Sequence, residues 1–150
     1  MAKPTYRGFR GPWLRELRSA KDWTQEALGV RMGVFPPLIG KWERGETVPD
    51  PGNVVKLASL LGVRPQDFTD VPLDKANLVD LRVWAGHTRL TAAAAAKISV
   101  KRLFNLEHHT VPPSNEEEQA LARVYGVGTT TVVAAWARGR AAAYPETLAR

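Results

Sequence analysis

Few side chains in this sequence have the chemistry to hold a metal ion or to act as a catalyst. His108 and His109 are neighbours, and neighbouring positions on a helix point about 100° apart, so together with His87 they do not form a metal-binding spacing. The chain has no cysteine, which excludes a disulfide framework and a thiolate metal site and fits a reducing compartment. We therefore predict no metal, no cofactor and no enzymatic activity.

The charged residues point instead to a polyanionic partner. The 150 residues include 21 Lys and Arg against 15 Asp and Glu, which gives a formal net charge of +6. Each Lys or Arg placed on a phosphate releases a counterion, so a positive excess favours nucleic acid, although charge alone fits a basic protein without such a partner equally well. No stretch approaches the roughly 20 apolar residues of a membrane span, and the first residues lack the apolar core of a secretion signal. We expect a cytoplasmic, nucleoid-associated protein with no membrane partner.

The elements that must position these charges are repeated along the chain. The sequence matches itself without a gap when it is shifted by 64 positions. The identical pairs include Leu14 and Leu78, Leu17 and Leu81, Arg18 and Arg82, Thr24 and Thr88, Glu43 and Glu107, Pro49 and Pro113, Leu57 and Leu121, Ala58 and Ala122, Gly62 and Gly126, and Val63 and Val127. We infer two copies of one fold: a basic N-terminal arm (1–12), a first domain (13–70), a second domain (76–140) and a C-terminal tail (141–150). Pro72, in the segment 70–74, marks the joint.

The first copy is predicted to consist of five helices. Apolar residues at helical spacing from Trp13 to Ala20 predict the first, and Thr24 is a suitable N-cap for the second. Gly33 suits a turn with positive φ before a third helix, whose first turn tolerates Pro36 and Pro37. Asp50-Pro51 opens a fourth helix that ends at Gly62, and residues 65–68 form a short fifth.

The second copy is predicted to follow the same plan. Thr88, Ser99 and Ser114 are expected to cap its second, third and fourth helices, and Ser114 with Glu117 has the pattern of a capping box. Lys97 replaces Gly33, so either a lysine adopts the left-handed conformation or the turn differs. No run alternates with period two for long enough to be a strand, so the predicted fold class is all-α.

These residues resemble a known family. Thr24-Gln-Glu-Ala-Leu28, Gly33-Val34, residues 39–45, Pro49 and residues 57–63 are similar to the Cro and lambda-repressor type of helix-turn-helix domain, and the second copy is a weaker match. The resemblance implies two tandem five-helix lambda-repressor-like domains. In this family an Arg on helix one meets a Glu that ends helix three, which implies the pairs Arg18–Glu43 and Arg82–Glu107 as structural ion pairs.

The same resemblance implies which residues meet DNA, because helix three of this fold lies in the major groove and helix two starts at a phosphate. The implied contacts of the first copy are Gln25, Phe35, Pro36, Pro37, Gly40, Lys41 and Arg44. Those of the second copy are Arg89, Ser99, Val100, Lys101, Arg102 and Asn105. Lys101, Arg102 and Asn105 are suitable base readers, whereas the prolines and Phe35 of the first copy cannot donate to a base. One copy could therefore serve packing or dimerisation instead.

Some residues outside these helices have two readings. Lys3, Arg7 and Arg10 belong to an arm that either reaches DNA or is a solvated tail. The acids Glu46, Asp50 and 116–118 near the expected DNA face are interpreted as solvent-facing helix caps. Trp136 in the last helix either covers the core or contributes to a partner surface.

The function hypothesis is a sequence-specific regulator that binds double-stranded DNA, a repressor of the phage or plasmid type that occludes its operator. The sequence leaves open whether the protein also pairs with itself as a homodimer or binds a regulatory protein. The alternative is a protein-interaction adaptor, such as an antirepressor, an antitoxin or a replication accessory, because Phe35 and its neighbours form an apolar face.

Overall fold

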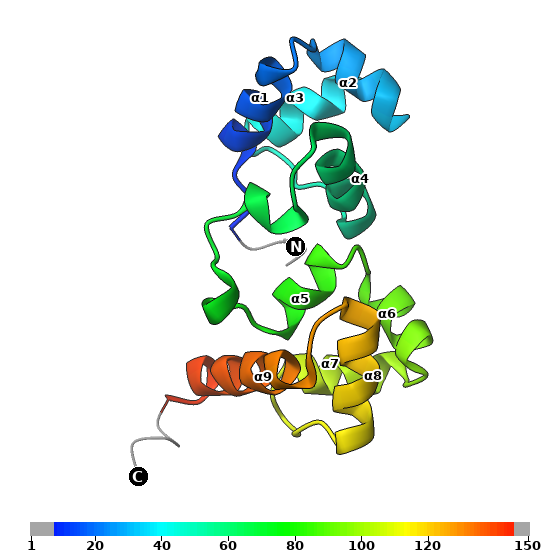
Figure 1. Ribbon diagram of the computed structural model, residues 1–150, viewed down its shortest axis with the longest axis vertical. Helices are drawn as coiled ribbons and strands as arrows, with labels where there is room; N and C mark the ends of the chain where they lie inside the picture. The colour runs from blue at the N-terminus through cyan, green and yellow to red at the C-terminus, as the bar shows by residue number, and fades with distance from the viewer. Residues whose placement is uncertain (1–7, 146–150) are drawn as a thin grey trace. The chain divides into compact units, whose positions relative to one another are not determined.

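A computed structural model describes residues 8–145, and these residues are helical apart from their turns and one isolated bridge between Phe9 and Thr69 (Figure 1). The all-α fold class is confirmed for this part of the chain. The chain separates into two compact units, 1–71 and 72–150, at a boundary inside the predicted joint. No described helix has both the length and the apolar composition to cross a membrane.

The first unit, called unit 1 below, has four α-helices and one short 3₁₀ helix. Their bounds are α1 Gly11–Ala20, α2 Gln25–Met32, α3 Pro37–Glu43, α4 Pro51–Leu61 and η1 Pro65–Phe68. Thr24 and Asp50 accept hydrogen bonds from the backbone N–H of Ala27 and Asn53, as expected of N-caps. Gly33 ends α2 in the left-handed conformation, with φ +70°, which turns the chain from α2 into α3.

The core of unit 1 is built from one apolar side of each helix. Its fully buried side chains include Leu14, Leu28, Ile39, Leu57 and Phe68. The spacing of these residues along the helices places them on inward faces, as the sequence predicts. At the start of α1 the backbone itself is in close contact with α3.

The second unit, called unit 2 below, contains the remaining helices. Their bounds are η2 Leu73–Lys75, α5 Leu78–Trp84, α6 Arg89–Ala96, α7 Val100–Glu107, α8 Asn115–Tyr125 and α9 Thr129–Ala143. Thr88, Ser99 and Ser114 cap α6, α7 and α8 as predicted, and the capping box of Ser114 and Glu117 is present. Lys97 adopts the left-handed conformation, with φ +59°, so the turn before α7 keeps its geometry without a glycine.

The last helix of unit 2 departs from the plan. The corresponding segment of unit 1 is the four-residue η1, whereas α9 has 15 residues and continues beyond position 140, where we expected the domain to end. Arg138 donates to the backbone oxygens of Ala76 (2.9 Å) and Leu73 (3.3 Å), which anchors α9 to the start of the unit. Trp136 is half-buried beside His109, with the ring centroids 6.3 Å apart.

The close contact at Gly11 makes a stability prediction. A Cβ added at Gly11 would lie 2.4 Å from the carbonyl oxygens of both Trp42 and Glu43, so a methyl group requires α1 and α3 to separate. Gly11→Ala should therefore lower the free energy of unfolding by about 1–3 kcal/mol in urea denaturation followed by circular dichroism. The matched control is Gly52→Ala, in the first turn of α4, where the nearest atom would be 3.5 Å away. Equal midpoints for the two variants would contradict the contact.

Candidate nucleic-acid interface

In unit 1 a buried carboxylate holds the first residue of α2, which lies at one end of the candidate interface. Glu43, at the end of α3, accepts from Arg18 through Nε (2.6 Å) and Nη2 (3.1 Å), which confirms the pair that the resemblance implied. The same carboxylate accepts from Nε2 of Gln25 (3.0 Å), the first residue of α2. Gln25, predicted to contact a phosphate, is thus held in place by the residue that also fixes α1.

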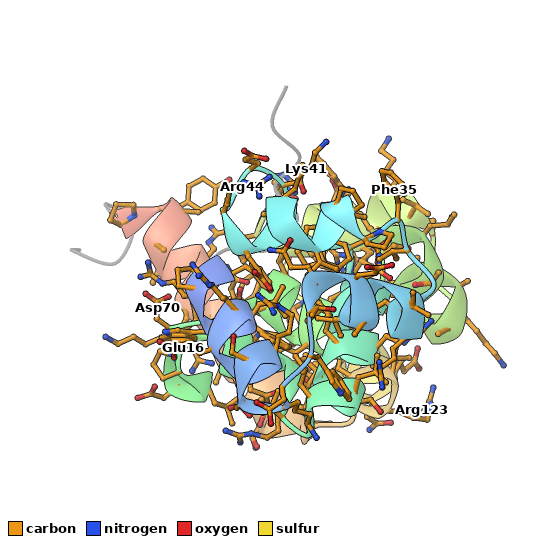
Figure 2. All side chains as sticks on the ribbon, turned by 90° about the horizontal axis from the view of Figure 1, so that it is seen from above. Glu16, Phe35, Lys41, Arg44, Asp70 and Arg123 are labelled. Atoms are coloured by element: carbon orange, nitrogen blue, oxygen red, sulfur yellow. The ribbon has the colours of Figure 1, made fainter. Side chains whose placement is uncertain are left out.

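The outer side of α3 is formed by fewer side chains than the sequence predicts. Phe35, Lys41 and Arg44 lie along it (Figure 2), and Phe35 is 76% exposed. Pro36 faces α2 instead, because a Cβ on Gly29 would lie 2.7 Å from its Cα. Gly40 is buried and presents no side chain.

A side chain at position 40 would collide with two neighbouring side chains. A Cβ there would lie 2.8 Å from Nη1 of Arg44 and 3.2 Å from Oε1 of Gln25, so the glycine leaves room for both side chains. Arg44 is paired with Glu46 at 3.0 Å, and both side chains are more than half exposed. This pairing raises the pKa of Arg44 and lowers that of Glu46. Glu46 is thus the partner of a predicted DNA contact, not the helix cap that we expected.

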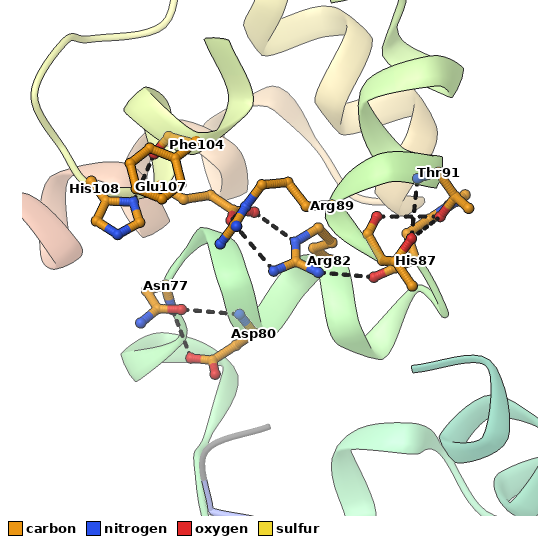
Figure 3. A network of polar contacts seen from close by, with 10 residues as sticks. Asn77, Asp80, Arg82, His87, Arg89, Thr91, Phe104, Glu107 and His108 are labelled. Carbon is orange, nitrogen blue, oxygen red and sulfur yellow. Dashed lines mark hydrogen bonds and ion pairs between the residues drawn. The ribbon is translucent and has the colours of Figure 1, made fainter. Parts of the chain in front are cut away.

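Unit 2 has a corresponding carboxylate with a larger network around it (Figure 3). Glu107 accepts from Nε of Arg82 (2.7 Å), the second implied ion pair, and from Nε of Arg89 (3.0 Å), the first residue of α6. The guanidinium of Arg89 also lies over the ring of Phe104, 5.1 Å from its centroid. Phe104 in turn stacks on His108, with the centroids 3.7 Å apart. Arg89 is therefore part of a three-layer stack on one side of α7.

The outer residues of α7 differ in how freely they could reach a ligand. Val100 and Lys101 are exposed, and Asn105 is half-exposed. The hydroxyl of Ser99 accepts from the backbone N–H of Arg102 (2.9 Å), so it serves as the cap of the helix. Lys101 and Asn105 are four positions apart and share one side of the helix.

Arg102 does not lie where a base reader is expected. Its Nε and Nη2 each donate to Glu117 at 2.7 Å, and Nη2 also donates to the carbonyl of Pro112 at 3.4 Å. This hydrogen-bonded pair lowers the pKa of Glu117 to about 2 and raises that of Arg102. The helical spacing could have indicated this orientation. Arg102 is about 100° around α7 from Lys101 and lies on the same side as Leu106, four residues later. Glu117 is therefore both the predicted cap of α8 and the partner of Arg102, and the second role was not predicted from the sequence.

The predicted N-terminal arm is shorter than 12 residues. Arg10 forms an ion pair with Asp70, its backbone N–H donates to the carbonyl of Phe68 (2.7 Å), and α1 begins at the next residue. The ring of Phe9 lies 5.7 Å from that of Phe68. Arg10 is thus attached to the end of unit 1 and is not part of a free arm. Lys3 and Arg7 lie outside the described residues.

Residues 14–68 match the family model described as Helix-turn-helix, and this match runs from within α1 to the end of η1 in unit 1. No curated protein and no solved structure matches the chain.

Glu107, the buried carboxylate of unit 2, should contribute strongly to the stability of that unit. Glu107→Gln leaves Arg82 and Arg89 without a charged partner, and the loss of one member of a buried pair costs about 3–5 kcal/mol. Urea denaturation should show this loss, whereas Glu46→Gln, in an exposed pair, should leave the midpoint nearly unchanged. If both variants unfold at the midpoint of the unchanged chain, the network does not stabilise the fold.

The pair of Arg102 and Glu117 predicts an acid dependence. The pKa of Glu117 is about 2 in the folded chain and 4.5 ordinarily, so the carboxylate stabilises the fold fully above pH 4.5. That contribution is lost as the pH falls from 4.5 to 2. Glu117→Gln should therefore be less stable at neutral pH, and its stability should fall less steeply over this range. Urea midpoints from pH 7 to 2 measure this, with Glu116→Gln as the control that keeps the steep loss; equal slopes would refute the assignment.

Proposed function

We propose that this protein is a sequence-specific regulator of transcription that binds double-stranded DNA through both of its units, because residues 14–68 match the model of the Cro/C1-type helix-turn-helix family. The observation that carries the proposal is this family match, which by itself suggests a DNA-binding regulator. A protein of this kind would act on the nucleoid in the cytoplasm.

We propose further that unit 2 is a second copy of the same domain. The 64-residue register supports this, because it relates the cap Thr24 to Thr88 and the left-handed Gly33 to Lys97. It also relates the buried pair of Arg18 and Glu43 to that of Arg82 and Glu107. Two recognition helices in one chain could read two half-sites, and in dimers of this class half-sites lie about 34 Å apart.

The two units would contribute differently to recognition. The outer side of α7 offers Lys101, which can donate to guanine, and Asn105, which can pair with adenine. The outer side of α3 offers Lys41 and Arg44 as donors, beside the exposed apolar ring of Phe35. Because the two surfaces differ, one chain should prefer an asymmetric site. Occlusion of an operator is a mechanism that two DNA-binding helical units can perform by themselves.

A second candidate function has one observation in its favour. Val30 and Phe35 are apolar and 69% and 76% exposed, at the end of α2 and in the turn that follows it. Such a surface suits a protein partner, as an antirepressor or antitoxin adaptor would need. Binding to DNA that weakens steeply with salt supports the regulator, whereas binding that ignores both DNA and salt supports the adaptor.

Selection of bound DNA from a random pool, with the number of chains per duplex measured by mass, tests the proposal. One enriched asymmetric sequence with a single chain bound supports two reading units. An enriched palindrome with two chains means that one unit reads and the other mediates dimerisation. No enrichment at low salt would overturn the proposed function.

Lys101 provides a residue-level prediction within this function. Lys101→Ala should weaken binding to the selected site by about 1–3 kcal/mol and relax the preference at one base pair, as expected for a base-reading side chain. Arg123→Ala on α8 makes the same change in net charge at an exposed position and should have a smaller effect. Competition binding against single-base variants of the site measures both. An unchanged preference in Lys101→Ala would remove this residue from the interface.

A further inference from the structure

The ion pair between Arg102 and Glu117 connects the candidate recognition helix α7 to the start of α8. Two parallel hydrogen bonds of 2.7 Å join the guanidinium to the carboxylate, which is the strongest geometry available to this pair of side chains. The side chain of Glu117 is 13% exposed and that of Arg102 is 35% exposed. The pair therefore lies at the edge of the protein, within reach of solvent.

Glu117 is held by more than Arg102. Its Oε1 also accepts from the backbone N–H of Ser114 at 2.9 Å, at the N-terminus of α8. An arginine fork and a helix N-terminus are both groups that bind phosphate oxygens in other proteins. The carboxylate of Glu117 thus occupies the donors that could otherwise receive an anion.

The surroundings of the pair leave it accessible. An open hollow at the surface of unit 2 is lined by Arg102 and Glu117 together with Lys97, Ser114 and Glu116. Lys97, in the turn before α7, and the half-exposed Arg102 give this hollow positive charge, and Glu116 and Glu117 offset it. In this hollow a phosphate oxygen could bind Nε and Nη2 of Arg102 only in place of the carboxylate of Glu117.

The pair has no equivalent in unit 1, so the helix arrangement that the two units share does not require it. Positions 64 residues earlier hold Leu38 and Asn53, which cannot form an ion pair. In unit 1 the turn of α4 is capped without such a contact, since Asp50 accepts from the backbone of Asn53 at 2.8 Å. The cap and the helix therefore need no arginine, and the pair of unit 2 calls for another explanation.

We propose that Glu117 acts as an internal competitor of DNA phosphate: it holds Arg102 away from the backbone of the DNA and lowers the affinity of unit 2 for it. In this arrangement α7 reads DNA through Lys101 and Asn105, and Arg102 is a positioning residue that joins α7 to α8. The inference rests on the proposed function, because it assumes that the outer side of α7 faces DNA. It corrects the sequence-based prediction that Arg102 reads a base.

The consequence for binding follows from charge. In a chain without the carboxylate, Arg102 is free to neutralise one more phosphate, and each neutralised phosphate steepens the slope of log affinity against log salt by about 0.9. The removal of any acid near DNA also raises affinity through the general field, so the control must remove an equal charge from the same turn. Glu116 is exposed on that turn and provides it.

The experiment measures affinity for a fixed duplex, the selected site or, failing one, random-sequence DNA, over a range of salt concentrations. The variants are Glu117→Gln, Glu116→Gln, Arg102→Gln and the double variant with both Arg102→Gln and Glu117→Gln. Glutamine can still serve at the third position of a capping box, so α8 should remain folded, and circular dichroism checks this. We expect Glu117→Gln to bind more tightly than Glu116→Gln, with a slope steeper by about 0.9, and we expect the double variant to lose this difference.

Several outcomes would overturn the inference. Equal slopes for Glu117→Gln and Glu116→Gln would show that Glu117 acts only through its charge. A loss of affinity in the double variant as large as that in Lys101→Ala would show that Arg102 already contacts DNA, because the removal of both members of the pair leaves the net charge unchanged. If the unchanged chain and every variant fail to bind any duplex at low salt, the proposed function fails, and this inference fails with it. Binding by the unchanged chain without the Glu117 effect refutes the inference alone.

Discussion

In each unit the helices are arranged around one buried carboxylate. Glu43 and Glu107 each end one helix and accept from an arginine of the unit's first α-helix. An isolated carboxylate in these positions would be costly to bury, so each network is stable only as a complete set of partners. The angle between those two helices is thereby tied to a few hydrogen bonds rather than to apolar packing alone.

The same carboxylates tie the candidate interface to the core. Gln25 and Arg89, at the first positions of α2 and α6, donate to Glu43 and Glu107. A side chain fixed in this way loses little conformational entropy if a phosphate approaches it, because its rotamer is already selected. Arg89 is restrained further by its contact with Phe104. The network therefore serves the fold and also prepares one end of the interface.

The two units use the surface around this frame in different ways. In unit 1 α3 begins with Pro37, Pro36 before it faces α2, and Gly40 is buried, so the outer side of this helix offers few donors. In unit 2 the outer side of α7 offers Lys101 and Asn105, while Arg89 and Arg102 are held by acids. The same helix arrangement thus presents a largely apolar surface on α3 of unit 1 and a polar surface with restrained arginines on α7 of unit 2.

The helices with their caps and turns follow from the amino-acid sequence alone, because they depend on residues a few positions apart. The register between the copies follows from identical residues 64 positions apart. Thr24, Gly33 and Ser114 could be assigned from local rules, and the resemblance implied the two long-range pairs. The partners of Arg10 and Arg102 and the length of α9 became apparent only from the folded structure. An exposed arginine has several acids within reach of its long side chain, and the choice among them depends on where the helices meet in space. The same holds for Pro36 and Gly40, whose orientation is set by the contact of α2 with α3.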